Sequence, residues 1–172
     1  EFFRKAITKD IEPVVLPENL IEEKLSNDYG KNAFYSIDDV LAKKIKEYAR
    51  TKGLTDTMIY FGAYAILLSK YASKEVVYTS LSLTNRIHPE VQDIIGMFVN
   101  TLPVQISVNG SVNEYLANIK ELLLNLYEYQ EISYADVAAS IPITDSSAMN
   151  TSFVFQADGD KKARLNGKEY TP

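Results

Sequence analysis

The chain has 172 residues and a formal net charge of −5, with 23 acidic and 18 basic residues. This length supports one domain with a sizeable core, and the acidic balance excludes a nucleic-acid-binding surface, which needs clustered lysine and arginine. The absence of cysteine excludes disulfides and thiolate zinc sites and suits a reducing cytoplasm, where we expect the protein to be located.

The first forty residues carry weak structural signals. Residues 1–8 predict a short helix, and Pro13 and Pro17 prevent its continuation because proline lacks the backbone donor and restricts its predecessor. A polar, acidic surface loop is expected at 17–30. The alternation of residues 31–37 predicts a short strand.

Two helices are predicted next. Ser36 is the expected N-cap of the first, Asp39 completes a capping box, and the helix ends near Gly53. Its apolar residues recur on one face, which is typical of an amphipathic surface helix. The second helix starts at Thr55, and its apolar side chains occupy nearly the whole circumference, so we expect burial on most sides. Its apolar run, residues 58–68, is too short to cross a bilayer.

The second half of the chain alternates strands and helices. β-Branched and apolar residues predict a strand at 75–83, and a regular apolar stripe predicts a helix at 112–126. A further helix is expected at 134–140 and a strand at 151–156, with a weak hairpin after Asp158-Gly159. Because helices can cover one side of such a sheet, the pattern predicts an α/β two-layer sandwich, a mixed sheet with helices packed on one face.

The stretch 93–104 is the most unusual in the chain. Its side chains are apolar almost without a break over 94–99, and then two hydrogen-bonding residues, Asn100 and Thr101, interrupt them. A strand covered on both faces should be continuously apolar, so the Asn100 amide needs internal partners or a cavity. The alternative is an edge strand whose asparagine caps a turn. Gly96 within the apolar run indicates a bulge or a close backbone approach.

Candidates for catalysis are few. The chain has one histidine, His88, in a polar loop with no carboxylate partner beyond Glu90, so we expect an exposed loop residue. Arg86 follows a strand pattern, and a buried arginine there would need a carboxylate to offset its desolvation; the alternative is a solvated loop arginine. No Gly-rich phosphate loop, metal-ligand cluster or Ser/His/Asp constellation is visible. The sequence therefore predicts no catalytic residue and no metal site.

Five stretches of the chain stand out as possible motifs. Residues 95–101 read Ile-Gly-Met-Phe-Val-Asn-Thr. The other four are Glu-Phe-Phe-Arg-Lys-Ala at 1–6, the strand 76–86 ending in arginine, Tyr-Gln-Glu-Ile-Ser-Tyr at 129–134 and Asn-Thr-Ser-Phe-Val-Phe-Gln at 150–156. The first resembles the Ile-Gly-x-Phe-Val-Asn-Thr signature of the condensation domains of nonribosomal peptide synthetases. The others are similar, in that family's order, to its Tyr-Trp-x-x-x-Leu, strand-arginine, His-Gln-Asp-x-Pro-Phe and Asn-Pro-Leu-Phe…Gln-Asn motifs.

Some positions depart from the family pattern. Thr151 replaces the proline of the last motif and Ala157 its final asparagine. The family's reaction centre, a His-His-x-x-x-Asp-Gly motif in the first lobe, is absent, since His88 is the only histidine. The resemblance therefore implies that residues 1–172 are one domain, the C-terminal lobe of a condensation domain, with a fold similar to chloramphenicol acetyltransferase. Because the chain starts with Glu1 and not with methionine, we expect a piece of a longer polypeptide.

The resemblance also implies chemistry and partners. The parent enzyme would form an amide bond between two thioesters carried on the phosphopantetheine arms of peptidyl carrier proteins. This chain itself would bind no cofactor and be inactive alone. Its expected partners are the N-terminal lobe of the same domain and carrier proteins, without nucleic acid or membrane. The uncovered lobe face predicts some self-association.

The site implied by the resemblance is structural. Arg86, Asn100, Thr101 and Gln156 are expected to line the tunnel wall, and Arg86 to pair with the motif aspartate of the first lobe. Without that partner, we expect Arg86 near Asn100 or Thr101, either solvated or paired with Asp93.

Two alternatives share this fold. The chain can belong to an epimerisation, cyclisation or acyltransferase relative, which the sequence upstream would decide. It can also be a degenerate, non-catalytic docking module, which Ala157 and the loose match at 129–134 favour.

Overall fold

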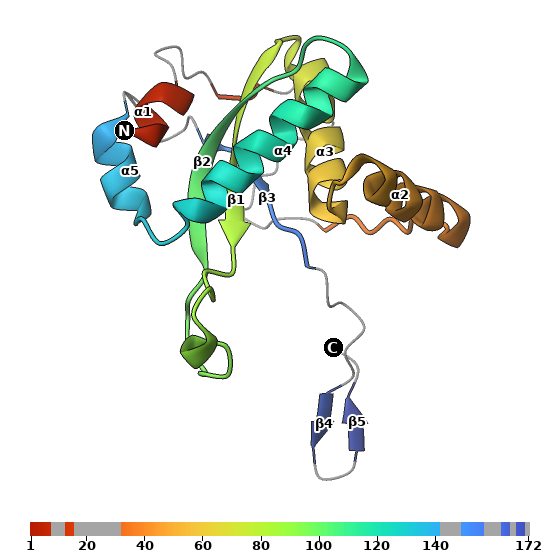
Figure 1. Cartoon of the computed structure of the whole chain (residues 1–172), viewed down its shortest axis with the longest axis vertical. Helices are drawn as coiled ribbons and strands as arrows, with labels where there is room; N and C mark the ends of the chain where they lie inside the picture. The colour runs from red at the N-terminus through yellow and green to blue at the C-terminus, as the bar shows by residue number, and fades with distance from the viewer. Residues whose placement is uncertain (8–12, 16–31, 142–148, 157–162, 166–167, 171–172) are drawn as a thin grey trace, which may run out of the picture.

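The structure, a computed structural model, describes residues 1–7, 13–15, 32–141, 149–156, 163–165 and 168–170. Its elements in chain order are α1 (Phe2–Ala6), α2 (Asp39–Lys52), α3 (Asp56–Ala72), β1 (Val76–Leu83), the short 3-10 helix η2 (Pro89–Val91), β2 (Asn100–Ser107), α4 (Val112–Glu128), α5 (Tyr134–Ser140), β3 (Ser152–Phe153), β4 (Ala163–Leu165) and β5 (Lys168–Tyr170). Figure 1 shows α4 crossing in front of β1 and β2, with α3 beside it.

A three-stranded mixed sheet has the order β2-β1-β3. β1 pairs with β2 in the antiparallel direction, with Leu81 opposite Leu102, and with β3 in the parallel direction, with Leu81 beside Phe153. β4 and β5 form a separate two-stranded antiparallel sheet. The mixed sheet and its helical layer confirm the predicted α/β class.

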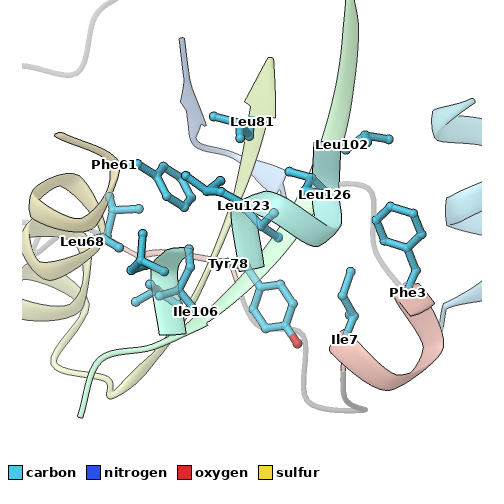
Figure 2. Packing of buried hydrophobic residues seen from close by; sticks show 14 of the residues in the cluster. Phe3, Ile7, Phe61, Leu68, Tyr78, Leu81, Leu102, Ile106, Leu123 and Leu126 are labelled. Carbon is cyan, nitrogen blue, oxygen red and sulfur yellow. The ribbon is translucent and has the colours of Figure 1, made fainter. Parts of the chain in front are cut away.

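The hydrophobic core lies between this sheet and the two long helices. Phe61 of α3, Leu81 of β1 and Leu123 of α4 are fully buried there, and Figure 2 shows them in one cluster. The Tyr115 hydroxyl donates a 2.8 Å hydrogen bond to the Gly62 carbonyl and so ties α4 to α3. Burial raises the pKa of Tyr115 to about 12. The core thus joins helices and strands that are far apart in sequence.

Helix ends follow local sequence signals. The Thr55 hydroxyl caps α3 and the Ser111 hydroxyl caps α4, where Glu114 completes a capping box. The α2 helix ends at Gly53 in the left-handed conformation (φ +62°), as its sequence predicts. Its N-cap is Asp38, which accepts a hydrogen bond from the Leu41 amide, so the predicted Ser36 cap is wrong.

Further predicted elements differ from the structure. The strand expected at 31–37 is absent over 32–37, the part that is described, and these residues are exposed. Without a neighbouring strand, alternation alone cannot form a sheet. The strand expected at 151–156 shortens to Ser152–Phe153. One face of α3 stays exposed, with Leu67 51% accessible, because α2, β1 and α4 cover only the other sides.

Some predictions fall outside the described residues. These are the loop at 17–30, the Asp158-Gly159 turn and the Ala157 position. The β4–β5 hairpin follows that turn in the chain. Within the described ranges, no helix is long and apolar enough to cross a membrane.

Candidate functional site

The loop between β1 and β2 starts with an uncommon backbone conformation. Asn85 has a left-handed backbone (φ +52°), which asparagine tolerates better than most residues. Its Oδ1 atom is buried and has no hydrogen-bond partner in the described part of the chain. Figure 1 shows the loop, with η2 in it, extending past the ends of both strands.

Arg86 is surrounded by backbone carbonyls of this loop. Its Nη1 atom donates hydrogen bonds to the carbonyls of Val91, Gln92 (3.3 Å) and Ile94 (2.9 Å), and Nη2 donates to Gly96 (3.1 Å). A guanidinium offers five donors in a rigid planar fork. One side chain can therefore satisfy several carbonyls that have no strand partner. We call Arg86 and these four carbonyls the arginine clamp.

The ring of Phe98 completes the surroundings of Arg86. The guanidinium carbon lies 4.4 Å from the ring centre, a cation–π geometry. A Cβ atom at Gly96 would lie 3.3 Å from Phe98 Cε2, closer than an ordinary contact. The close approach predicted for Gly96 is thus confirmed.

The structure corrects two expectations about Arg86. It is half-buried, not fully solvated, and its acceptors are carbonyl oxygens. Among the described residues it forms no ion pair with Asp93, which is exposed. Carbonyl dipoles here take the place of the expected carboxylate.

The apolar part of the signature is a loop and not a buried strand. β2 begins only at Asn100. Before it, the side chains of Ile95 and Met97 are 102% and 88% exposed, and those of Ile94 and Val99 are also exposed. We call residues 92–99 the signature loop. The apolar run predicted burial, but here the backbone carbonyls turn inward to Arg86 instead.

Asn100 joins the signature to a second motif. Its Nδ2 atom donates to the carbonyls of Gln130 (2.8 Å) and Ile132 (2.6 Å), and its Oδ1 atom accepts from the Thr101 amide (3.0 Å). The amide therefore has internal partners. β2 is also an edge strand of the described sheet, and the partners of Asn100 lie in the turn after α4, so both alternatives hold together. It holds the turn between α4 and α5, within the 129–134 motif.

A cavity of about 150 Å³ lies beside this turn. Its lining comes from α3, the end of β1, the end of α4 and the residues after β3: Thr57, Leu81, Ser82, Leu83, Thr84, Tyr127, Gln130 and Phe155. Burial raises the pKa of Tyr127 above its ordinary value. No sequence signal pointed to Thr57, Ser82 or Tyr127, because only the fold brings these elements together.

The other two predicted site residues differ in their contacts. The Thr101 hydroxyl lies 3.2 Å from the Ser82 hydroxyl, across the β1–β2 pair and next to the cavity. Gln156 is exposed beyond β3 and, within the described chain, has no hydrogen bond. Its neighbour Phe155 lines the cavity and stacks on Tyr60. The structure thus brings Asn100 and Thr101 to the cavity region but gives Gln156 no contact there.

Thr151, which replaces a family proline, has hydrogen-bonding partners of its own. Its hydroxyl lies within hydrogen-bond distance of the Tyr78 carbonyl (3.3 Å) and the Thr79 hydroxyl (3.0 Å), and its carbonyl accepts from the Ser80 amide (3.1 Å). The departure from the motif therefore adds bonds between β1 and the segment leading into β3.

His88 is an exposed loop residue, as expected. Its Nε2 atom lies 3.2 Å from Glu131 Oε1, and both side chains are mostly exposed. The carboxylate partner is thus Glu131 and not the neighbouring Glu90. No group of three or more potential metal ligands occurs in the described part of the chain.

Comparison with known proteins decides the family. The family model described as "Condensation domain" matches residues 1–171. This chain belongs to the condensation domain family. The stretches 95–101 and 129–134, joined by Asn100, both lie within the matched residues.

Relatives of this condensation-domain chain are large synthases. Bacitracin synthase 3 of Bacillus licheniformis is 29% identical over 178 residues, which cover 100% of this chain and 3% of the relative. Gramicidin S synthase 2 of Brevibacillus brevis is 25% identical over 177 residues, 99% of this chain and 4% of the relative. The chain therefore spans only a small part of the curated relatives it matches.

Solved structures show the same fold. A four-domain nonribosomal peptide synthetase bound to AMP and glycine matches with a TM-score of 0.72 at 14% identity, over 92% of this chain and 13% of that chain. The condensation domain of the Monacolin K polyketide synthase matches with a TM-score of 0.63 at 18% identity, over 87% of this chain and 34% of that one. The second match shows that a condensation domain extends well beyond the part that this chain resembles.

Proposed function

We propose that this chain is the C-terminal lobe of a condensation domain in a nonribosomal peptide synthetase. The parent enzyme forms an amide bond: the amine of an acceptor aminoacyl thioester attacks the carbonyl of a donor thioester, and the donor's thiol leaves. Both thioesters are carried on phosphopantetheine arms of carrier proteins. The similarity to bacitracin and gramicidin synthases over the whole chain supports this proposal.

The observation that carries the proposal is the Asn100 bridge. One amide holds the carbonyls of Gln130 and Ile132 and so fixes two family motifs relative to each other, beside the cavity that Gln130 lines. Aligning two reactants can supply a large share of a rate enhancement, provided that the walls around them are rigid. We propose that Asn100, Thr101 and Arg86 hold one wall of the reaction tunnel, and that Gln156 lies at its rim.

The chain alone should not catalyse the reaction. General acid–base catalysis needs a side chain with a suitable pKa within hydrogen-bond reach of the transferred proton. The only histidine, His88, instead pairs with Glu131 on the surface. We propose that a first lobe carrying the His-His-x-x-x-Asp-Gly motif supplies the reacting histidine and that the complete domain works in the cytoplasm.

The partners proposed are that first lobe and peptidyl carrier proteins. The exposed apolar side chains of the signature loop support a covering lobe at this end of the sheet. Self-association through the same surface stays a prediction.

The test compares the chain alone with a two-lobed domain. The chain is incubated with carrier-bound donor and acceptor thioesters, alone and fused behind the first lobe of a related condensation domain. We expect amide product, followed by mass spectrometry, only from the fusion. A fusion with the second motif histidine replaced by alanine is the control and should lose most turnover. Amide formation by the chain alone, or an inactive fusion that is folded, would contradict the proposal.

A further inference from the structure

We propose that Arg86 is a positioning residue, which acts by binding the carbonyls of the signature loop and so fixes the apolar surface that the loop presents. The first part concerns this chain alone. The second part, that this surface receives the first lobe, rests on the proposed function.

The first step is the convergence of carbonyls on one group. Four loop carbonyls between Val91 and Gly96 accept from the two terminal nitrogens of Arg86. Hydrogen bonds from a charged donor contribute more than those between neutral groups, and in the loop between η2 and β2 no strand supplies a donor to these carbonyls. Removing the guanidinium therefore removes the shared donor of this segment at once.

The second step is the aromatic ring that packs against the guanidinium. Phe98 lies against Arg86 with its ring centre 4.4 Å from Cζ, and the same ring approaches Gly96 closely. A lysine has a single nitrogen and no planar fork, so it cannot reproduce either the set of carbonyl bonds or the stacking. The arrangement is specific for arginine.

The third step is the consequence for the side chains. The carbonyls of Gln92, Ile94 and Gly96 bind Arg86, while the apolar residues Ile95 and Met97 are almost fully exposed. A cluster of exposed apolar side chains marks a contact surface. The occupant that fits is the first lobe, since the condensation domain of similar structure contains much more chain than this one matches.

Arg86 acts on the loop and not on the hydrophobic core. It is absent from the core cluster, and its hydrogen bonds all end within ten residues of its own position. Loss of the clamp should therefore increase opening of the loop and leave the unfolding transition of the domain nearly unchanged, because local opening and global unfolding are separate equilibria.

The first experiment uses the isolated chain and hydrogen exchange of the amides at 92–98. The variants are Arg86→Ala and Arg86→Lys, with Arg50→Ala on the exposed face of α2 as the matched control. We expect exchange in the loop to rise roughly tenfold or more in both Arg86 variants, the size expected for the loss of one charged hydrogen bond. The control should match the unmodified chain in loop exchange. The urea midpoints of all the variants and of the unmodified chain should agree.

Two results would overturn the clamp. One is unchanged loop exchange in Arg86→Ala, and the other is global unfolding of both Arg86 variants, which would make Arg86 a core charge. Phe98→Leu gives an independent check, because it keeps an apolar side chain but removes the aromatic face. We expect the rate of loop exchange in this variant to lie between the rates of the unmodified chain and of Arg86→Ala. An unchanged rate would also count against the proposal.

The second experiment measures binding of a separately expressed first lobe to the same variants. We expect Arg86→Ala and Ile95→Ser to weaken binding about tenfold, with Arg50→Ala unchanged. If the unmodified chain does not bind the first lobe, the proposed function fails while the exchange data still decide the clamp. If Arg86→Ala loosens the loop but binds normally, the clamp stands and its role in presenting the surface is wrong.

Discussion

The helical core and the signature loop both contain runs of apolar residues, but they use them in opposite ways. In α4, Leu123 is buried against the sheet, and the helix satisfies its own backbone. In the signature loop, Ile95 is fully exposed, and a single arginine satisfies the backbone. The same residue types thus stabilise the fold in one region and form an open surface in the other.

This difference shows where the stability of each region comes from. In the core, burial of apolar side chains is the dominant favourable term. In the loop, charged hydrogen bonds and one ring contact hold the backbone, and the side chains contribute little until something covers them. Substitutions in the core should therefore lower global stability, and substitutions in the loop should lower local order.

The largest effect is expected for Leu123→Ala. Leu123 is completely buried, and truncation of such a leucine costs about 2–5 kcal/mol through lost transfer energy and a cavity. Leu124→Ala, on the next residue of the same helix, is the control, since Leu124 is 49% exposed. Its free energy of unfolding should change by only about 0.5 kcal/mol. Urea unfolding measures the change in both variants. Equal losses of unfolding free energy would show that burial does not set the contribution of these leucines.

A smaller effect is expected for Asn100→Ala, at the junction of the two regions. The change removes two hydrogen bonds, to the Gln130 and Ile132 carbonyls, and at about 0.5–1.5 kcal/mol each their loss should cost about 1–3 kcal/mol. Asn118→Ala, on an exposed part of α4, is the control and should be near neutral. We expect hydrogen exchange to rise at 129–134 in the Asn100 variant alone. Unchanged exchange there would show that the bridge does not hold the turn.

The smallest effect at neutral pH is expected for Tyr115→Phe. It removes the hydrogen bond to the Gly62 carbonyl, which contributes about 0.5–1.5 kcal/mol. Burial raises the pKa of Tyr115 from 10.0 to about 12 in the folded state, so folding favours the neutral phenol. The stability that comes from burying the neutral phenol is complete below pH 10 and is lost as the pH rises toward 12.

The measurement is the urea midpoint between pH 8 and 12. The unmodified chain should lose stability more steeply than Tyr115→Phe above pH 10. Some slope should remain in the variant, because burial also raises the pKa of Tyr127. Tyr127→Phe is thus the matched control. Identical pH profiles for Tyr115→Phe and the unmodified chain would show that the Tyr115 phenol is solvated.

The sequence by itself determined the helices and the family. Caps such as Ser111 with Glu114 act within one turn, and the apolar stripe of α4 repeats with the helical period, so both can be recognised without a fold. The motif at 95–101 also identified the condensation domain resemblance. These signals are local, and each residue's partner lies at a fixed spacing along the chain.

Tertiary structure alone decided how the site is assembled. Asn100 reaches Gln130 across thirty residues, and the cavity lining comes from four parts of the chain. The signature loop was wrongly expected to be a strand, because an apolar run carries no information on which of its backbone groups find partners. Whether such a run is buried or exposed depends on what packs against it in space, and here Arg86 binds its carbonyls while nothing in the described chain covers Ile95.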